Sequence, residues 1–164
     1  MAEKKTAAKT AKATKATKTA VKAQPRLKAL YNNVVDTRNC TCLGDGKGNL
    51  VSTIEHLMSA LSVCGIDNAL IETDNQEIPI MDGSAKPFYD ILSDVTLKEQ
   101  PADKKILRLK KRVEYTDEKG NSVSLEPSRE DNLHIRYSIE FPSQIVGLQQ
   151  FYDGISPAIY SSKI

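Results

Sequence analysis

The chain has 164 residues, a net charge of +2 and a hydrophobic content of 40%, which suits one ordinary domain or two small ones. No apolar run approaches the roughly 20 residues of a membrane-spanning helix. No secretory signal with an apolar segment is recognisable at the N-terminus. Three cysteines form no even disulfide framework, so reduced thiols in a cytoplasmic protein are expected.

Residues 1–28 form a basic segment of low complexity. They contain eight lysines and Arg26 against Glu3 alone, so the rest of the chain is net acidic. Because lysine, alanine and threonine offer no large apolar face and like charges repel, the pattern predicts a disordered tail. Such a tail could bind polyanions weakly, without specific nucleic-acid recognition. A merely solubilising extension explains the same composition.

Two cysteines, Cys40 and Cys42, follow an expected extended segment and form a C-x-C pair. Without a second pair this is a weak signal for a metal. Packing, or a place in the wall of a site, is the preferred interpretation. A turn is expected next, at residues 45–49.

A helix is predicted from Ser52 to the residues just before Gly65. Ser52 followed by Glu55 is typical of a capping box, and Gly65 is suited to ending the helix. Apolar residues recur at helical spacing and predict one buried stripe: Ile54, Leu57, Met58 and Leu61.

Glu55 and His56 stand off this stripe, in the expected first turn. A carboxylate beside an imidazole can activate water on a metal, since the imidazole binds the ion and the carboxylate takes the proton. Glu55 could equally be a capping residue only, and His56 a surface histidine. The H-E-x-x-H motif is not matched, so further metal ligands must come from elsewhere.

A short strand at 68–73, an edge or irregular strand at 77–81 and a second helix beginning at Ser84 are expected next. Ser84 is a suitable N-cap, and Pro87 is tolerated in the first turn. Phe88, Ile91 and Leu92 begin an apolar stripe at helical spacing. Two amphipathic helices against strands predict a two-layer α+β domain at 29–98.

The polar residues 99–104 are the expected linker, and residues 105–164 the beginning of a second, incomplete α+β domain. Beyond the linker the apolar period changes to two, which predicts strands. His134 falls on the polar face of one of them. A surface histidine is preferred there over a metal ligand.

Three segments in fixed order resemble the UDP-3-O-acyl-N-acetylglucosamine deacetylases: STIEHLMSAL at 52–61, GIDN at 65–68 and IPIMDGSA at 78–85. TRNCTCL at 37–43 and YSIEFP at 137–142 are similar to this family too. The resemblance covers about residues 29–150. It implies two similar α+β domains with the site between them.

The resemblance also implies a zinc-dependent hydrolase that removes an N-acetyl group from a UDP-sugar in lipid A biosynthesis, in the cytoplasm of Gram-negative bacteria. Carried onto this sequence, His56 is a zinc ligand and Glu55 the general base. Asn39 and Cys40 match a loop that contacts the substrate.

Departures from the family pattern are expected to matter. The lysine-rich tail stands where the family has its first strands, and Ala158-Ile159-Tyr160-Ser161 stands where it has Ala-Arg-Thr-Phe. The family's second-domain zinc histidine and aspartate have no counterpart. A truncated or rearranged member, inactive by itself, is therefore expected. The alternative is a non-catalytic fragment or pseudoenzyme that retains only the first half-site.

Overall fold

The computed structural model describes residues 7–11, 25–130 and 132–163. The elements in chain order are β1 (Ala7–Ala11), the 3-10 helix η1 (Tyr31–Asn33), β2 (Val34–Asp36), β3 (Cys42–Gly44), β4 (Leu50–Val51), α1 (Glu55–Val63), β5 (Asn68–Ala69), α2 (Lys86–Ser93), β6 (Leu97–Asp103), β7 (Val113–Thr116), β8 (Ser122–Leu125), β9 (Leu133–Glu140), β10 (Leu148–Ile155) and α3 (Pro157–Lys163). Helices mixed with small, mostly antiparallel sheets confirm the α+β class. Among the described residues, no helix is long and apolar enough to cross a membrane.

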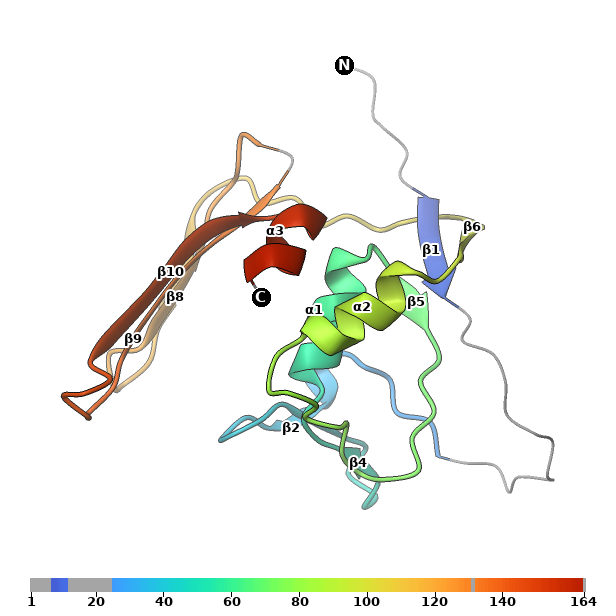
Figure 1. The fold of residues 1–164 in the computed structure, drawn as a ribbon, viewed down its shortest axis with the longest axis horizontal. Coiled ribbons are helices and arrows are strands. Elements are labelled where there is room, and N and C mark those ends of the chain that lie inside the picture. Colours follow the sequence, from blue (N-terminus) through green and yellow to red (C-terminus); the bar gives the residue numbers. More distant parts are fainter. Residues whose placement is uncertain (1–6, 12–24, 131, 164) are drawn as a thin grey trace.

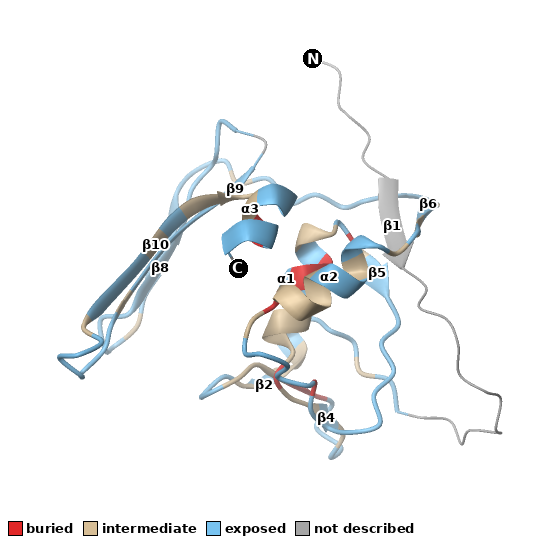
Figure 2. Ribbon diagram, viewed as in Figure 1, coloured by how far each residue is buried: buried red, intermediate tan, exposed pale blue. Residues whose placement is uncertain are grey.

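Helices α1 and α2 lie side by side at the centre of the molecule (Figure 1). Figure 2 shows that the buried residues are few and gather around these helices. Ala60 and Leu61 of α1 are buried, as are Ile66 and Ile78 in the segments that follow it. The predicted stripe of α2 is only partly covered, since Ile91 is 61% exposed. The core is therefore small, and α1 is its main contributor.

Helix α1 begins at Glu55, three residues later than Ser52, and no capping box forms. The Ser52 N–H and hydroxyl both donate to the Gln76 carbonyl, at 2.8 and 3.2 Å. Thr53 takes a left-handed backbone with φ of 58°, which breaks the helical path between Ser52 and Ile54. The capping prediction for Glu55 is thus wrong, because its partner residue is paired with a neighbouring segment.

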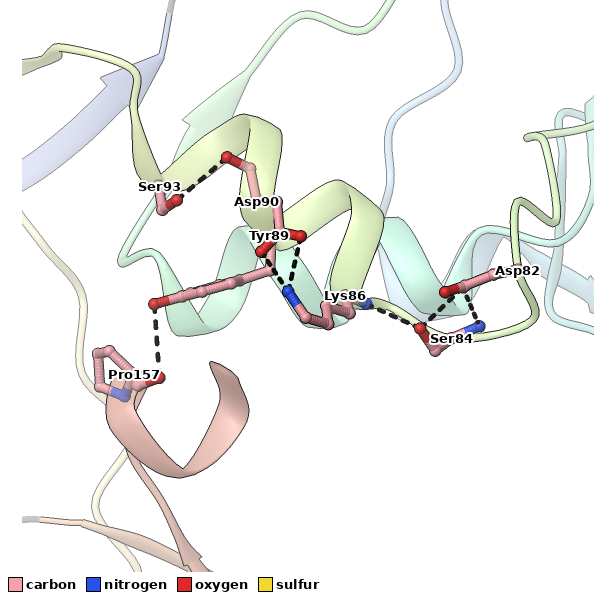
Figure 3. A network of polar contacts seen from close by, with 7 residues as sticks. All are labelled: Asp82, Ser84, Lys86, Tyr89, Asp90, Ser93 and Pro157. Carbon is pink, nitrogen blue, oxygen red and sulfur yellow. Dashed lines mark hydrogen bonds and ion pairs between the residues drawn. The ribbon is translucent and has the colours of Figure 1, made fainter. Parts of the chain in front are cut away.

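The start of α2 is held by a short polar network (Figure 3). Asp82 Oδ1 accepts hydrogen bonds from the Ser84 N–H and hydroxyl, at 2.9 and 2.8 Å, and these bonds lower the pKa of Asp82. The Lys86 N–H donates to Ser84 Oγ at 3.2 Å. The N-cap of α2 is Ala85 and not Ser84 as predicted, because the helix begins at Lys86, although Ser84 still accepts from the first helical amide.

Strand β1 lies between β5 and β6 in a three-stranded sheet (Figure 1). Residues 7–11 lie within the segment predicted to be a disordered tail, and residues 99–103 lie within the predicted linker, yet both are strand residues in the structure. Composition reflects side chains, whereas strand pairing uses main-chain hydrogen bonds, which need no apolar residue. Pro101 is tolerated because it lies where the register of the β1–β6 pairing shifts. The rest of the tail, 1–6 and 12–24, lies outside the described residues.

The predicted turn at 45–49 and a second turn at 117–121 have the same hydrogen bonds. In each, the leading aspartate accepts from the N–H groups two and four residues later, and the closing asparagine donates its amide to that carboxylate. The first joins β3 to β4 and the second joins β7 to β8. The same hairpin device thus occurs in both halves of the chain.

The C-terminal part consists of the hairpins β7–β8 and β9–β10, followed by α3. Helix α3 returns to the centre, where Tyr160, 2% exposed, donates its hydroxyl to Ser59 Oγ of α1 at 2.8 Å. His134 is exposed on β9 and lies 2.8 Å from Glu130, which confirms its interpretation as a surface histidine. Neither β10 nor α3 was expected individually from the sequence.

Candidate functional site

Glu55 and His56 occupy the first turn of α1, and both are half-buried. The helix cannot extend further back because Thr53 is left-handed, so these two side chains stand at its N-terminal end. A helix N-terminus favours a negative charge. Glu55 is the acidic residue of this first turn.

The Glu55 carboxylate is oriented by the loop that precedes β3. The Thr41 N–H donates to Glu55 Oε2 at 2.9 Å, and the Ile54 N–H donates to the Thr41 carbonyl at 3.3 Å. Thr41 therefore contacts the start of α1 through both of its main-chain groups. These bonds fix the loop of residues 37–41 against the candidate base.

Asn39 and Cys40 lie on this same loop, Asn39 exposed and Cys40 half-buried. The sequence-predicted residues therefore come from two segments that Thr41 and Glu55 tie together. Arg38 binds Asp36 at 2.7 Å. The Arg38 guanidinium holds the pKa of Asp36 at about 2.

The Cys40 and Cys42 sulfurs are 3.5 Å apart. The hydrogen bond with Cys40, followed by burial, raises the pKa of the Cys42 thiol, and the Glu55 charge adds to the shift. The pair flanks Thr41, whose N–H holds the Glu55 carboxylate.

Two further residues support the site and were missed by the sequence reasoning. Thr53, 6% exposed, donates its hydroxyl to Glu77 Oε1 at 2.8 Å. A left-handed backbone in a non-glycine residue costs about 1–3 kcal/mol, so its contacts must hold Thr53 in place. The helical pattern concealed this residue, since nothing in an S-T-I-E-H sequence signals a positive φ.

The chain matches the family described as LpxC, UDP-3-O-acyl N-acetylglycosamine deacetylase, over residues 6–164. The chain belongs to this family. Three similar curated proteins are named UDP-3-O-acyl-N-acetylglucosamine deacetylase. The one from Campylobacter lari is 44% identical over 80% of this chain and 44% of its own length, and the one from Campylobacter jejuni subsp. jejuni serotype O:23/36 is 42% identical over 84% of this chain and 45% of its own length. The one from Aliarcobacter butzleri is 38% identical over 80% of this chain and 42% of its own length.

The chain thus matches less than half the length of these deacetylases. The family match begins at residue 6, well before the start at residue 29 that the sequence motifs indicated. It includes β1 (Ala7–Ala11). The family match therefore extends into the lysine-rich segment.

The described residues offer few side chains near His56 that could bind a metal ion. In the part of the chain that the structure describes, no group of three or more His, Cys, Asp or Glu side chains could hold a metal ion. The second histidine, His134, is paired with Glu130 on the β9 side of the molecule. The described residues therefore provide His56 beside Glu55, but they do not provide a complete deacetylase metal site.

Proposed function

We propose that this chain carries one half of the active site of a UDP-3-O-acyl-N-acetylglucosamine deacetylase. The complete reaction is hydrolysis of the N-acetyl group of the UDP-sugar in lipid A biosynthesis, in the cytoplasm, with zinc as cofactor. The observation that carries the proposal is the Glu55 carboxylate, held at 2.9 Å by the Thr41 N–H directly beside His56. Family membership supplies the substrate and the reaction.

Glu55 is the proposed general base. Amide hydrolysis requires a proton to leave the attacking water, and a positioned carboxylate accepts it. The hydrogen bond from Thr41 uses Oε2 of this carboxylate. Oε1 is the oxygen that would accept the proton of the water. Asn39 and Cys40, on the loop that also carries Thr41, are the proposed substrate contacts.

His56 is the proposed zinc ligand, but the residues described here do not fit a whole zinc site. A catalytic zinc site has three protein ligands and an open position. The described residues contain no cluster of that size. We therefore assign no step to zinc on this chain, and we propose that the chain does not catalyse deacetylation alone.

The missing donor cluster also favours a second candidate function, a non-catalytic fragment or pseudoenzyme that keeps the first half-site. In that case the basic N-terminal segment, with eight lysines in residues 1–28, supplies a weak affinity for polyanions. The proposed domain division is a first domain at residues 29–98, a linker at 99–104 and an incomplete second domain at 105–164. Strand β6 spans the proposed boundary between the first domain and the linker.

A chimera decides between the two functions. Residues 29–164 of this chain replace the matching region of the Campylobacter lari deacetylase, and acetate release from UDP-3-O-acyl-N-acetylglucosamine is measured. Turnover is expected, because the half-site then meets the second half supplied by the relative. A folded chimera that binds zinc but releases no acetate would favour the non-catalytic alternative.

A further inference from the structure

Thr53 lies two residues before Glu55 in a conformation that β-branched residues rarely adopt. Its φ is 58° and its side chain is buried, with 6% exposure. Such a conformation persists only where the surroundings determine it, and residues of this kind are concentrated at functional sites. The contacts that hold Thr53 in this conformation are therefore candidates for a functional role.

One set of contacts fixes residues 52 and 53 to the segment 76–78. The Ser52 N–H donates to the Gln76 carbonyl at 2.8 Å, and the Ile78 N–H donates to the Ser52 carbonyl at 3.0 Å. The Thr53 hydroxyl donates to Glu77 Oε1 at 2.8 Å. Main chain and side chain together thus hold this turn from one side.

A second set of contacts lies on the other side of the turn. The Ile54 N–H donates to the Thr41 carbonyl at 3.3 Å, and the Thr41 N–H donates to Glu55 Oε2 at 2.9 Å. The backbone angle at Thr53 sets the direction in which the chain enters α1. That direction determines whether the carboxylate reaches the Thr41 amide.

We propose that Thr53 and Glu77 form a positioning pair that aligns the Glu55 carboxylate. The Thr53 hydroxyl bond to Glu77 holds the left-handed turn, the turn orients the first residues of α1, and Glu55 then meets the Thr41 N–H. Neither Thr53 nor Glu77 contacts the substrate in this scheme. The inference rests on the proposed function, because alignment matters for hydrolysis only if Glu55 is the base.

The test is amide hydrogen exchange in the ¹⁵N-labelled 164-residue chain, with the Thr41 amide as the reporter. Thr53→Val keeps the side-chain shape and removes the hydroxyl. Exchange of the Thr41 amide should then rise by about tenfold relative to the Cys64 amide, which bonds the Ala60 carbonyl at the C-terminal end of α1. Thr53→Ser, which restores the hydroxyl, should return the Thr41 rate to the original value.

Thr73→Val is the matched control. It also removes a threonine hydroxyl that donates a hydrogen bond, in this case to the Asn75 carbonyl at 2.8 Å in an exposed turn. The control should leave the Thr41 rate unchanged. If Thr53→Val does not fold, Glu77→Leu and Glu77→Gln provide a second pair of variants, because Glu77 is exposed. Glu77→Leu should accelerate exchange of the Thr41 amide. Glu77→Gln should not, because it retains an acceptor oxygen for the Thr53 hydroxyl.

Equal exchange at Thr41 in the original chain, Thr53→Val and Glu77→Leu would overturn the proposal. A parallel rise at Thr41 and Cys64 would also overturn it, because it indicates a general loss of stability. The readout does not depend on turnover. An inactive chimera would therefore refute the proposed deacetylase function without changing the exchange result.

Discussion

Glu55 and His56 are adjacent in the chain, but their replacement should have different effects. In the active chimera, Glu55→Ala is expected to keep zinc and to lower turnover by about 10²–10⁴-fold, the usual contribution of a general base. His56→Ala should lose zinc as well as turnover. Zinc content after dialysis and acetate release measure the two effects separately. Near-normal turnover in Glu55→Ala would leave Glu55 a structural residue only.

Asp36 provides a pH-dependent prediction beside the site. The Arg38 guanidinium holds the pKa of Asp36 at about 2, below its ordinary value of 3.8. Because the folded-state pKa is lowered, the contribution of this pair to stability is present above the unfolded pKa and is lost as the pH falls through about 2. Side-chain carboxyl NMR should give that midpoint, and Arg38→Gln should raise it towards 3.8. An unchanged midpoint in Arg38→Gln would contradict this assignment.

Helix α3 is attached to the central helices mainly by Tyr160. The Tyr160 hydroxyl bonds Ser59 at 2.8 Å, and its ring lies 5.2 Å from that of Tyr89. Tyr160→Phe should lower the free energy of unfolding by about 0.5–1.5 kcal/mol through loss of the hydrogen bond. Tyr160→Ala should lower it by about 3–5 kcal/mol, as for other large buried aromatic residues.

Urea unfolding followed by circular dichroism measures both Tyr160 variants. Tyr31, which is 91% exposed, provides the control, because Tyr31→Phe should have no measurable effect. Equal midpoints for Tyr160→Ala and the original chain would show that α3 is not docked on α1.

Strand β1 changes the expectation for the N-terminal segment. Deletion of residues 1–11 should lower the melting temperature, because β5 and β6 then lose the strand that lies between them. Deletion of residues 1–5 is the matched control and should leave it unchanged. Thermal unfolding compares the two. Equal melting temperatures for both deletions would instead support a segment that is dispensable for folding.

The whole molecule exposes many large apolar side chains on its C-terminal hairpins. Leu133 is 62% exposed, Leu148 58% and Ile145, between β9 and β10, 98%. The β9–β10 and β7–β8 sheets each have two strands, and open strand edges favour association. The isolated chain should therefore self-associate as its concentration rises.

Ile145→Lys should reduce this association without changing the melting temperature, since Ile145 is almost fully exposed. Light scattering over a concentration series is the measurement. Ile106→Lys serves as the control, because Ile106 is 65% exposed but lies before β7, away from the hairpins. An equal reduction by both variants would argue against association through the hairpins.

The sequence by itself determined the family, the α+β class and the place of Glu55 and His56 in the first turn of a helix. These follow from local information: an ordered series of motifs, apolar residues at helical spacing and turn residues such as those at 45–49 and 117–121. These signals predict the structure correctly because they depend only on residues that are close in sequence. The exposed position of His134 was predictable for the same reason, from the alternation of its strand.

Only the tertiary structure decided where α1 begins and what holds Glu55. Ser52 bonds Gln76 and Thr53 bonds Glu77, and both partners are distant in sequence. A capping box and a left-handed turn compete for the same residues, and contacts with residues 76–78 favour the turn. β1 was missed for a related reason, because its pairing with β5 and β6 uses main-chain groups that composition does not reveal.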